Sequence, residues 1–167
     1  MIIGNKKILI SACLLGKRVR YDGNTLTVID QKLQDWIDNG WVVSVCPEVD
    51  AGMSIPRVPA EISNGDGHAV LMGKATVMTK AGDDVSDFFI KGASIALDLC
   101  RQHNIKVAVL SESSPSCGST TIYNGEFSAT KIGGVGVTTA LLNEKGIQVF
   151  SQFDLSKAFA EVERMQE

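Results

Sequence analysis

Histidine is scarce in this chain of 167 residues, which contains only His68 and His103. Neither stands beside a cysteine in the sequence, so a cysteine nucleophile of the protease type has no obvious base. Closely spaced pairs such as C-x2-C are also missing, since Cys13, Cys46 and Cys117 are widely separated. Structural zinc sites often contain such pairs. The sequence therefore argues against a cysteine hydrolase and against a conventional structural zinc site.

An excess of positive charge is missing as well. The 16 Lys and Arg residues face 19 Asp and Glu residues, for a net charge of −3, so nothing favours nucleic acid or an anionic membrane as a partner. No apolar run approaches the roughly 20 residues that a membrane-spanning helix needs, and no convincing signal-peptide cleavage site is present. We therefore expect a cytoplasmic protein whose cysteines stay reduced and serve as ligands, catalysts or core residues.

Three apolar runs each lead to a cysteine at or just past their carboxyl end. The runs are 7–12, 41–45 and 106–111, and the cysteines are Cys13, Cys46 and Cys117. Such runs indicate buried strands. In an open parallel sheet, the carboxyl ends of the strands face one crevice, where ligands usually bind. The pattern predicts that three thiols meet at one site.

The rest of the chain alternates between strand and helix patterns, without a repeat or a low-complexity linker. This alternation predicts a single α/β domain over residues 1–167, with three layers and a mostly parallel sheet. The segment 50–67, rich in Pro and Gly, is expected to be a long loop. The other expected elements are a strand at 147–150, hairpins at 69–78 and 120–128, and helices at 28–39, 85–103, 138–144 and from Asp154 or Ser156 onward.

Thiolates are soft ligands that suit Zn²⁺, Cu⁺ and iron–sulfur clusters. Three of them leave a coordination position open, as a catalytic metal centre requires. The alternative is that each thiol packs as a small apolar group, which is common for buried cysteines. That alternative is weaker for three cysteines in comparable places than for any one of them. Cys100 lies on the apolar face of a predicted helix and is expected to be such a core residue.

Polar residues suited to act on a substrate stand close to these cysteines. Glu48 follows Cys46 by two residues and is suited to proton transfer, although a solvated loop carboxylate would show the same spacing. Ser114 precedes Cys117 by three residues and is either a proton relay or a turn-forming hydroxyl.

Four further residues are candidates to contact a substrate: Arg20, Asp22, Arg57 and Ser116. The two arginines and the aspartate would grip a polar planar molecule, or else pair with one another as surface salt bridges. The glycines at 133–136 give only a weak anion-binding pattern, and more simply allow a loop and a helix to pack closely near the site.

Short segments in a fixed order carry a family resemblance: Ser11–Gly16, Val19–Gly23, Val45–Glu48, Pro56–Glu61 and Ser114–Gly118. Over nearly the whole chain, these segments resemble the thiouracil desulfidase family. The resemblance implies a [4Fe-4S] cluster bound by three cysteines, with a fourth iron free to take the sulfur of a thiolated nucleobase. It also implies Cys13, Cys46 and Cys117 as the ligands, and Glu48 and Ser114 as the catalytic residues.

We therefore expect a [4Fe-4S]-dependent desulfidase that converts a small thiolated base such as thiouracil into the oxo compound and sulfide. Glu48 would activate water, and Ser114 would assist proton transfer. Two alternatives use the same cysteines. One is a non-catalytic carrier of Fe–S units or sulfide, which does not need Glu48. The other is a zinc hydrolase with a metal-bound water.

Overall fold

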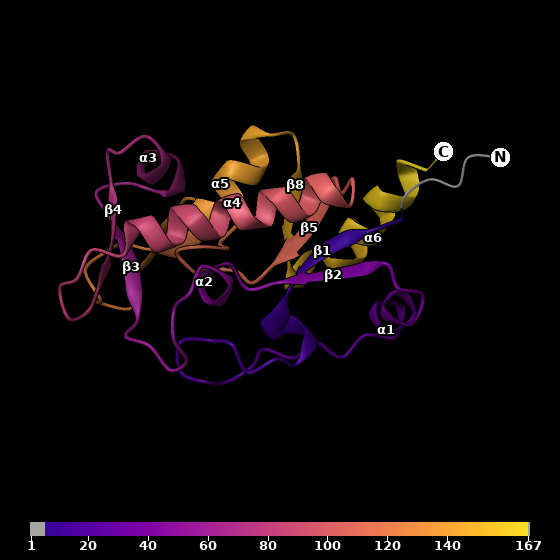
Figure 1. The fold of residues 1–167 in the computed structure, drawn as a ribbon, viewed down its shortest axis with the longest axis horizontal. Coiled ribbons are helices and arrows are strands. Elements are labelled where there is room, and N and C mark those ends of the chain that lie inside the picture. The colour runs from indigo at the N-terminus through magenta and orange to yellow at the C-terminus, as the bar shows by residue number, and fades with distance from the viewer. Residues whose placement is uncertain (1–5, 167) are drawn as a thin grey trace.

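The computed structural model describes residues 6–166, and a four-stranded parallel sheet forms its centre, in the order β2-β1-β5-β8. The register places Leu9 between Val43 and Ala108. All four strands run in the same direction, so their carboxyl ends lie along one edge of the sheet (Figure 1). The strands are β1 (Ile8–Ser11), β2 (Val42–Val45), β5 (Val107–Leu110) and β8 (Gln148–Ser151).

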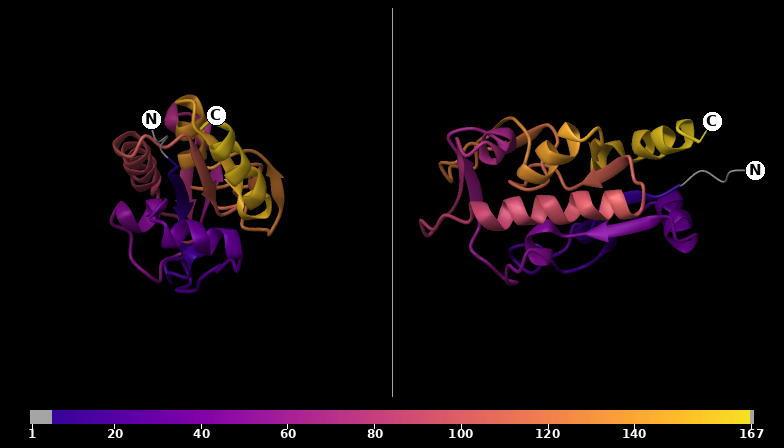
Figure 2. Two further views of the ribbon diagram at one scale, coloured as in Figure 1. Left: turned by 90° about the vertical axis from the view of Figure 1, so that its right-hand side faces the viewer. Right: turned by 45° about the horizontal axis from the view of Figure 1, so that its top comes forward.

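Helices cover both faces of this sheet, because successive side chains of a strand point to opposite sides. Ile8 and Ile10 pack beneath α1 (Gln31–Asp38) and α6 (Leu155–Arg164). Leu9 packs on the other face, with residues of α4 (Ser86–Gln102) and α5 (Val137–Glu144). The left view in Figure 2 shows α4 and α6 on opposite sides of the strands. The predicted three-layer α/β architecture is confirmed.

Two antiparallel strand pairs lie beyond the carboxyl edge of the sheet, with β3 and β4 at the left of Figure 1. A separate core that includes Phe89 and Ile122 joins them to α4. The pairs are β3 (Ala60–Ser63) with β4 (Thr76–Thr79), and β6 (Thr121–Tyr123) with β7 (Lys131–Gly133). The short helices are η1 (Ala12–Leu15), α2 (Pro47–Asp50), α3 (Gly67–Leu71) and η2 (Gln152–Asp154).

The helices and strands around the central sheet begin and end close to the predicted residues. The Asp30 carboxylate starts α1 by accepting the Leu33 N–H over 2.9 Å. The Asp84 carboxylate accepts the Ser86 N–H at the start of α4, also over 2.9 Å. Within residues 6–166, no helix has the length and apolar character needed to cross a membrane.

The predicted hairpin at 69–78 is wrong, because its first half is the helix α3. The Asp66 carboxylate accepts the N–H groups of His68 and Ala69 over 3.1 and 3.4 Å, which starts a helix there. The second half is β4, whose partner is β3. The strand β3 lies inside the segment 50–67, which the sequence predicts as a loop.

The predicted hairpin at 120–128 exists but closes further along the chain. Its second strand is β7, so Asn124 and Gly125 do not form the two-residue turn that their sequence suggests. Instead, the Glu61 carboxylate accepts the N–H groups of Gly125 and Phe127 over 3.0 and 3.3 Å. A contact from β3 therefore shapes this loop, and no pattern within the sequence of the loop predicts that contact.

Candidate functional site

A pocket of about 760 Å³ lies at the carboxyl edge of the central sheet and is lined by Cys13, Cys46 and Cys117. The convergence of these three cysteines on one pocket is therefore confirmed. Each comes from a different strand end: Cys13 lies in η1 after β1, Cys46 follows β2, and Cys117 lies in the loop after β5. All are free thiols.

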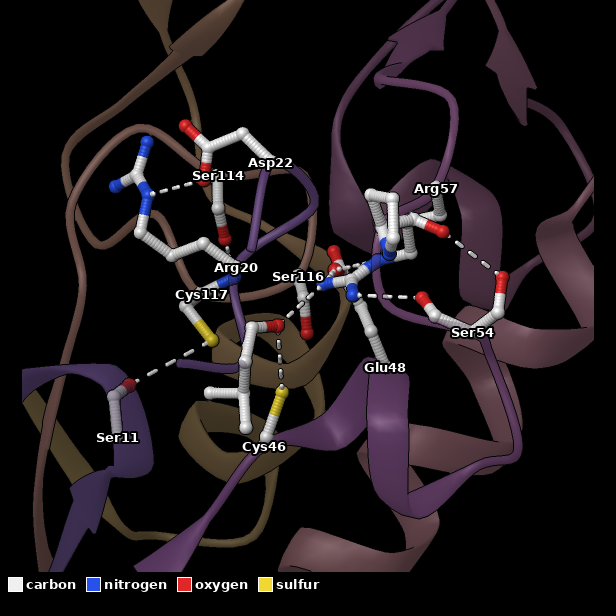
Figure 3. A network of polar contacts seen from close by, with 12 residues as sticks. Ser11, Arg20, Asp22, Cys46, Glu48, Ser54, Arg57, Ser114, Ser116 and Cys117 are labelled. Atoms are coloured by element: carbon white, nitrogen blue, oxygen red, sulfur yellow. Dashed lines mark hydrogen bonds and ion pairs between the residues drawn. The ribbon is translucent and has the colours of Figure 1, made fainter. Parts of the chain in front are cut away.

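Local hydrogen bonds fix the backbone at Cys46 and Cys117. The Cys46 N–H donates to the Asp50 carboxylate over 3.2 Å, and its thiol faces the Val19 carbonyl over 3.9 Å. The Cys117 N–H donates to the Ser114 hydroxyl over 2.7 Å, and the Ser11 hydroxyl contacts its sulfur over 4.0 Å. Figure 3 shows the two sulfurs within one network of polar side chains.

Burial disfavours the charged form of all three thiols. It raises the pKa of Cys13, that of Cys46 to about 11, and that of Cys117 to about 12. For Cys117, the nearby charges of Glu48, Cys13 and Cys46 add to the effect of burial. Because metals bind the thiolate, the binding of a cationic metal group at this site would release the protons of the thiols. A donor set of three buried thiols suits a soft metal centre.

The described part of the chain holds no three His, Cys, Asp or Glu side chains close enough together to bind a single metal ion. The three cysteines share the pocket without meeting at one point. A group with several metal atoms, each bound by a different thiolate, does not need its ligands to meet at one point.

Glu48 lies in α2 at the wall of the same pocket and forms an ion pair with Arg57. Arg57 donates from Nε to Glu48 Oε2 over 2.9 Å, and its Nη2 approaches the same oxygen. Arg57 also donates to the carbonyls of Ser54 and Val19, each over 3.1 Å. Figure 3 shows Arg57 between Glu48 and Ser54. Because the Val19 carbonyl also faces the Cys46 thiol, Arg57 links the carboxylate to a cysteine.

The other predicted polar residues take different places. Ser114 is partly exposed in the pocket and accepts the Cys117 N–H. Arg20 and Asp22 pair with each other over 3.7 Å near the surface. Ser116 also lines the pocket, but its hydroxyl is buried and bonds to Thr138 over 2.8 Å. That hydrogen bond leaves Ser116 poorly placed to contact a substrate.

Glu112 is a site residue that sequence reasoning missed. Its carboxylate accepts backbone N–H groups and hydroxyls along the loop that carries Ser114 and Cys117, from Ser113, Ser119, Thr120 and Thr121. Burial alone would raise the pKa of Glu112, but the hydrogen bonds from Thr120, Ser119, Thr121 and Ser113 lower it to about 2. In the sequence, the signal for this role is an acidic residue directly before a segment rich in Ser and Thr.

The predicted close approach of the glycine run is confirmed at Gly136. A Cβ there would lie 2.4 Å from the Ser116 carbonyl carbon and 2.7 Å from the Cys117 nitrogen. The Gly136 N–H also donates to the Gly118 carbonyl over 2.9 Å. The start of α5 therefore packs directly against the backbone that holds Cys117.

Three residues with metal-binding chemistry lie away from the pocket lining. Cys100 is 1% exposed in the core between α4 and the sheet, as predicted. His68 lies in α3 and contacts the Glu144 carboxylate over 3.0 Å. His103 follows α4 and lies 3.2 Å from the Lys7 amine.

Comparisons with known proteins agree over most of the chain. A model of a family described as 2-thiouracil desulfurase matches residues 8–154. The uncharacterized protein YbbK of Bacillus subtilis (strain 168) is 43% identical over 149 residues, which cover 89% of this chain and 97% of YbbK. The solved structure of the [4Fe-4S]-dependent thiouracil desulfidase TudS is similar, with 42% identity and a TM-score of 0.86. It covers 94% of this chain and 97% of TudS.

Proposed function

This chain belongs to the 2-thiouracil desulfurase family, and we propose that it is a [4Fe-4S]-dependent desulfidase that removes sulfur from thiolated nucleobases such as thiouracil. The observation that carries the proposal is the meeting of Cys13, Cys46 and Cys117 with Glu48 in one pocket. Similarity to TudS, a [4Fe-4S]-dependent thiouracil desulfidase, supports both the cofactor and the reaction.

Cys13, Cys46 and Cys117 are the proposed ligands of the cluster. When bound, the cluster would supply one iron without a cysteine ligand, which serves as a Lewis acid for the sulfur of the substrate. The three cysteines lie in a pocket that withdraws their thiols from water, so the positive charge of the metal would stabilise their thiolates.

Glu48 is the proposed general base. Arg57 occupies Oε2, whereas Oε1 accepts no hydrogen bond from any residue of the described chain. A carboxylate that is anchored through one oxygen keeps the other for a water molecule. Glu48 would take a proton from this water while the water oxygen attacks the carbon that bears the sulfur. The C–S bond then breaks, and the products are the oxo compound and sulfide, without net oxidation or reduction.

Ser114 is the proposed proton donor. Its hydroxyl oxygen accepts the Cys117 N–H over 2.7 Å, so its own hydrogen can point into the pocket. The hydroxyl would pass a proton to the departing sulfur and recover one from Glu48. This role explains why the same serine that shapes the turn before Cys117 is also open to the pocket.

The alternatives named above receive less support. A zinc hydrolase needs its ligands around one ion, and the described residues offer no such group. A carrier of Fe–S units or sulfide would need the cysteines but not a carboxylate held beside them by Arg57.

Anaerobic reconstitution tests the proposal. The loaded protein should contain four irons per chain by the stoichiometry of the cluster and should release sulfide from thiouracil. Cys13→Ser, Cys46→Ser and Cys117→Ser should each abolish stable cluster binding, and Cys100→Ala, a change in the core, should retain it. A fully loaded protein that releases no sulfide from any thiolated base would overturn the desulfidase proposal and favour the carrier.

A further inference from the structure

The fourth strand end of the central sheet contributes a residue that the proposed chemistry does not use. The ends of β1, β2 and β5 lead to Cys13, Cys46 and Cys117. The end of β8 leads into η2, whose middle residue, Phe153, lines the same pocket. Because the four strands are parallel, Phe153 lies at the same edge of the sheet as the three thiols.

Phe153 is unusually open to solvent for an aromatic side chain in a pocket. It is 80% exposed, whereas Phe89, which lines the same pocket, is 1% exposed and packed in a core. Among the described residues, Phe153 joins none of the three apolar clusters. Leaving so much apolar surface in water is unfavourable, and a ligand that covers the ring would recover that free energy.

The backbone that carries this ring is nevertheless fixed. The Ser151 hydroxyl accepts the Phe153 N–H over 3.2 Å. The side-chain oxygen of the neighbouring Gln152 accepts the Glu112 N–H over 3.0 Å, which ties η2 to the loop of Cys117. The fixed backbone therefore places the ring at the pocket wall, where it is left uncovered.

We infer that Phe153 forms the stacking surface for the planar ring of the substrate and so selects heteroaromatic thiocarbonyl compounds. The inference rests on the proposed function. A thiolated base carries its sulfur in the plane of the ring, so a flat apolar surface in the same pocket as the thiols can hold the ring while the sulfur and its carbon face the reacting groups. An aromatic face suits a base of any hydrogen-bonding pattern, because every base has a π-face.

Steady-state kinetics with thiouracil on anaerobically loaded variants test this role. A stacked base is worth about 1–3 kcal/mol by alanine substitution, which corresponds to about a 5- to 150-fold change at 1.36 kcal/mol per tenfold. Phe153→Ala should raise KM by such a factor and leave kcat largely unchanged, because stacking stabilises the bound substrate and the transition state alike. Phe153→Tyr should restore the wild-type KM, and Phe153→Leu should restore only part of it.

Ile29→Ala is the matched control. Ile29 is 97% exposed and lies outside the pocket lining, so removing this apolar side chain should leave KM unchanged. Iron content must be equal in all variants, so that a lost cluster is not mistaken for weak binding.

The possible failures are distinct. A loaded wild-type protein without activity overturns the proposed function. An active wild type whose KM is unchanged in Phe153→Ala overturns only the stacking role. If that variant keeps its KM and loses its cluster faster in air, Phe153 shields the cluster and does not bind the base.

Discussion

Arg57 donates from Nε to Glu48 Oε2 over 2.9 Å, and the two side chains are only 8% and 15% exposed. The pair lies at the wall of the pocket that Cys13, Cys46 and Cys117 share. The pairing gives Arg57 a defined task, which is to hold the carboxylate in one orientation.

Arg57→Met should destabilise the protein by about 3 kcal/mol, because it leaves the mostly buried Glu48 carboxylate without its partner. Urea unfolding of the cluster-free protein measures this loss. Arg57→Lys keeps the charge but not the two-pronged donor geometry of the guanidinium, so this variant should lose less stability than Arg57→Met. If the pair is coupled as described, adding Glu48→Gln to Arg57→Met should lower the free energy of unfolding little further. Equal stability of wild type and Arg57→Met would contradict the pairing.

Glu112→Gln should weaken the loop of Cys117 in a pH-dependent way. The folded pKa of Glu112, about 2, lies below the ordinary 4.5, so its stabilisation is complete above pH 4.5 and disappears as the pH falls towards 2. The unfolding free energies of wild type and variant should differ by roughly 1–2 kcal/mol at pH 7, since the carboxylate is partly exposed. Urea titrations from pH 6 to 2.5 should show that difference shrinking. A difference independent of pH would rule out the charge as its source.

Gly136→Ala should disturb the cysteine loop directly. Its Cβ would lie 2.4 Å from the Ser116 carbonyl carbon, so either α5 or the loop must move. We expect less iron per chain after reconstitution and a lower unfolding midpoint. Gly133→Ala is the matched control, because a Cβ at Gly133 meets no atom within 4 Å. Equal iron binding by both variants would show that the loop tolerates the shift.

The parallel core was predictable because its signals are local. The apolar runs at β1 and β5 are buried strands, whereas the run at β2, predicted to be buried, is a half-buried strand at the edge of the sheet. Parallel packing brings the ends of all three together whatever the intervening chain does. That single rule is enough to place Cys13, Cys46 and Cys117 in one pocket.

The errors fall where contacts between distant segments decide the structure. The runs at 69–72 and 75–78 are too short for periodicity to separate helix from strand, and β4 pairs with β3, which lies upstream of α3. The Glu48–Arg57 pair likewise depends on the path of the chain between them. The exposure of Phe153 arises because no other segment of the described chain packs against its ring, and a single sequence does not reveal this.

The most direct test of the central claim is sulfide release by loaded Glu48→Gln. This variant keeps the shape of the side chain and removes the base, so it should retain its iron and its colour. Its kcat on thiouracil should fall by roughly 10²–10⁴-fold, the usual contribution of a positioned general base. Full iron content together with wild-type kcat would contradict the claim that Glu48 activates the attacking water.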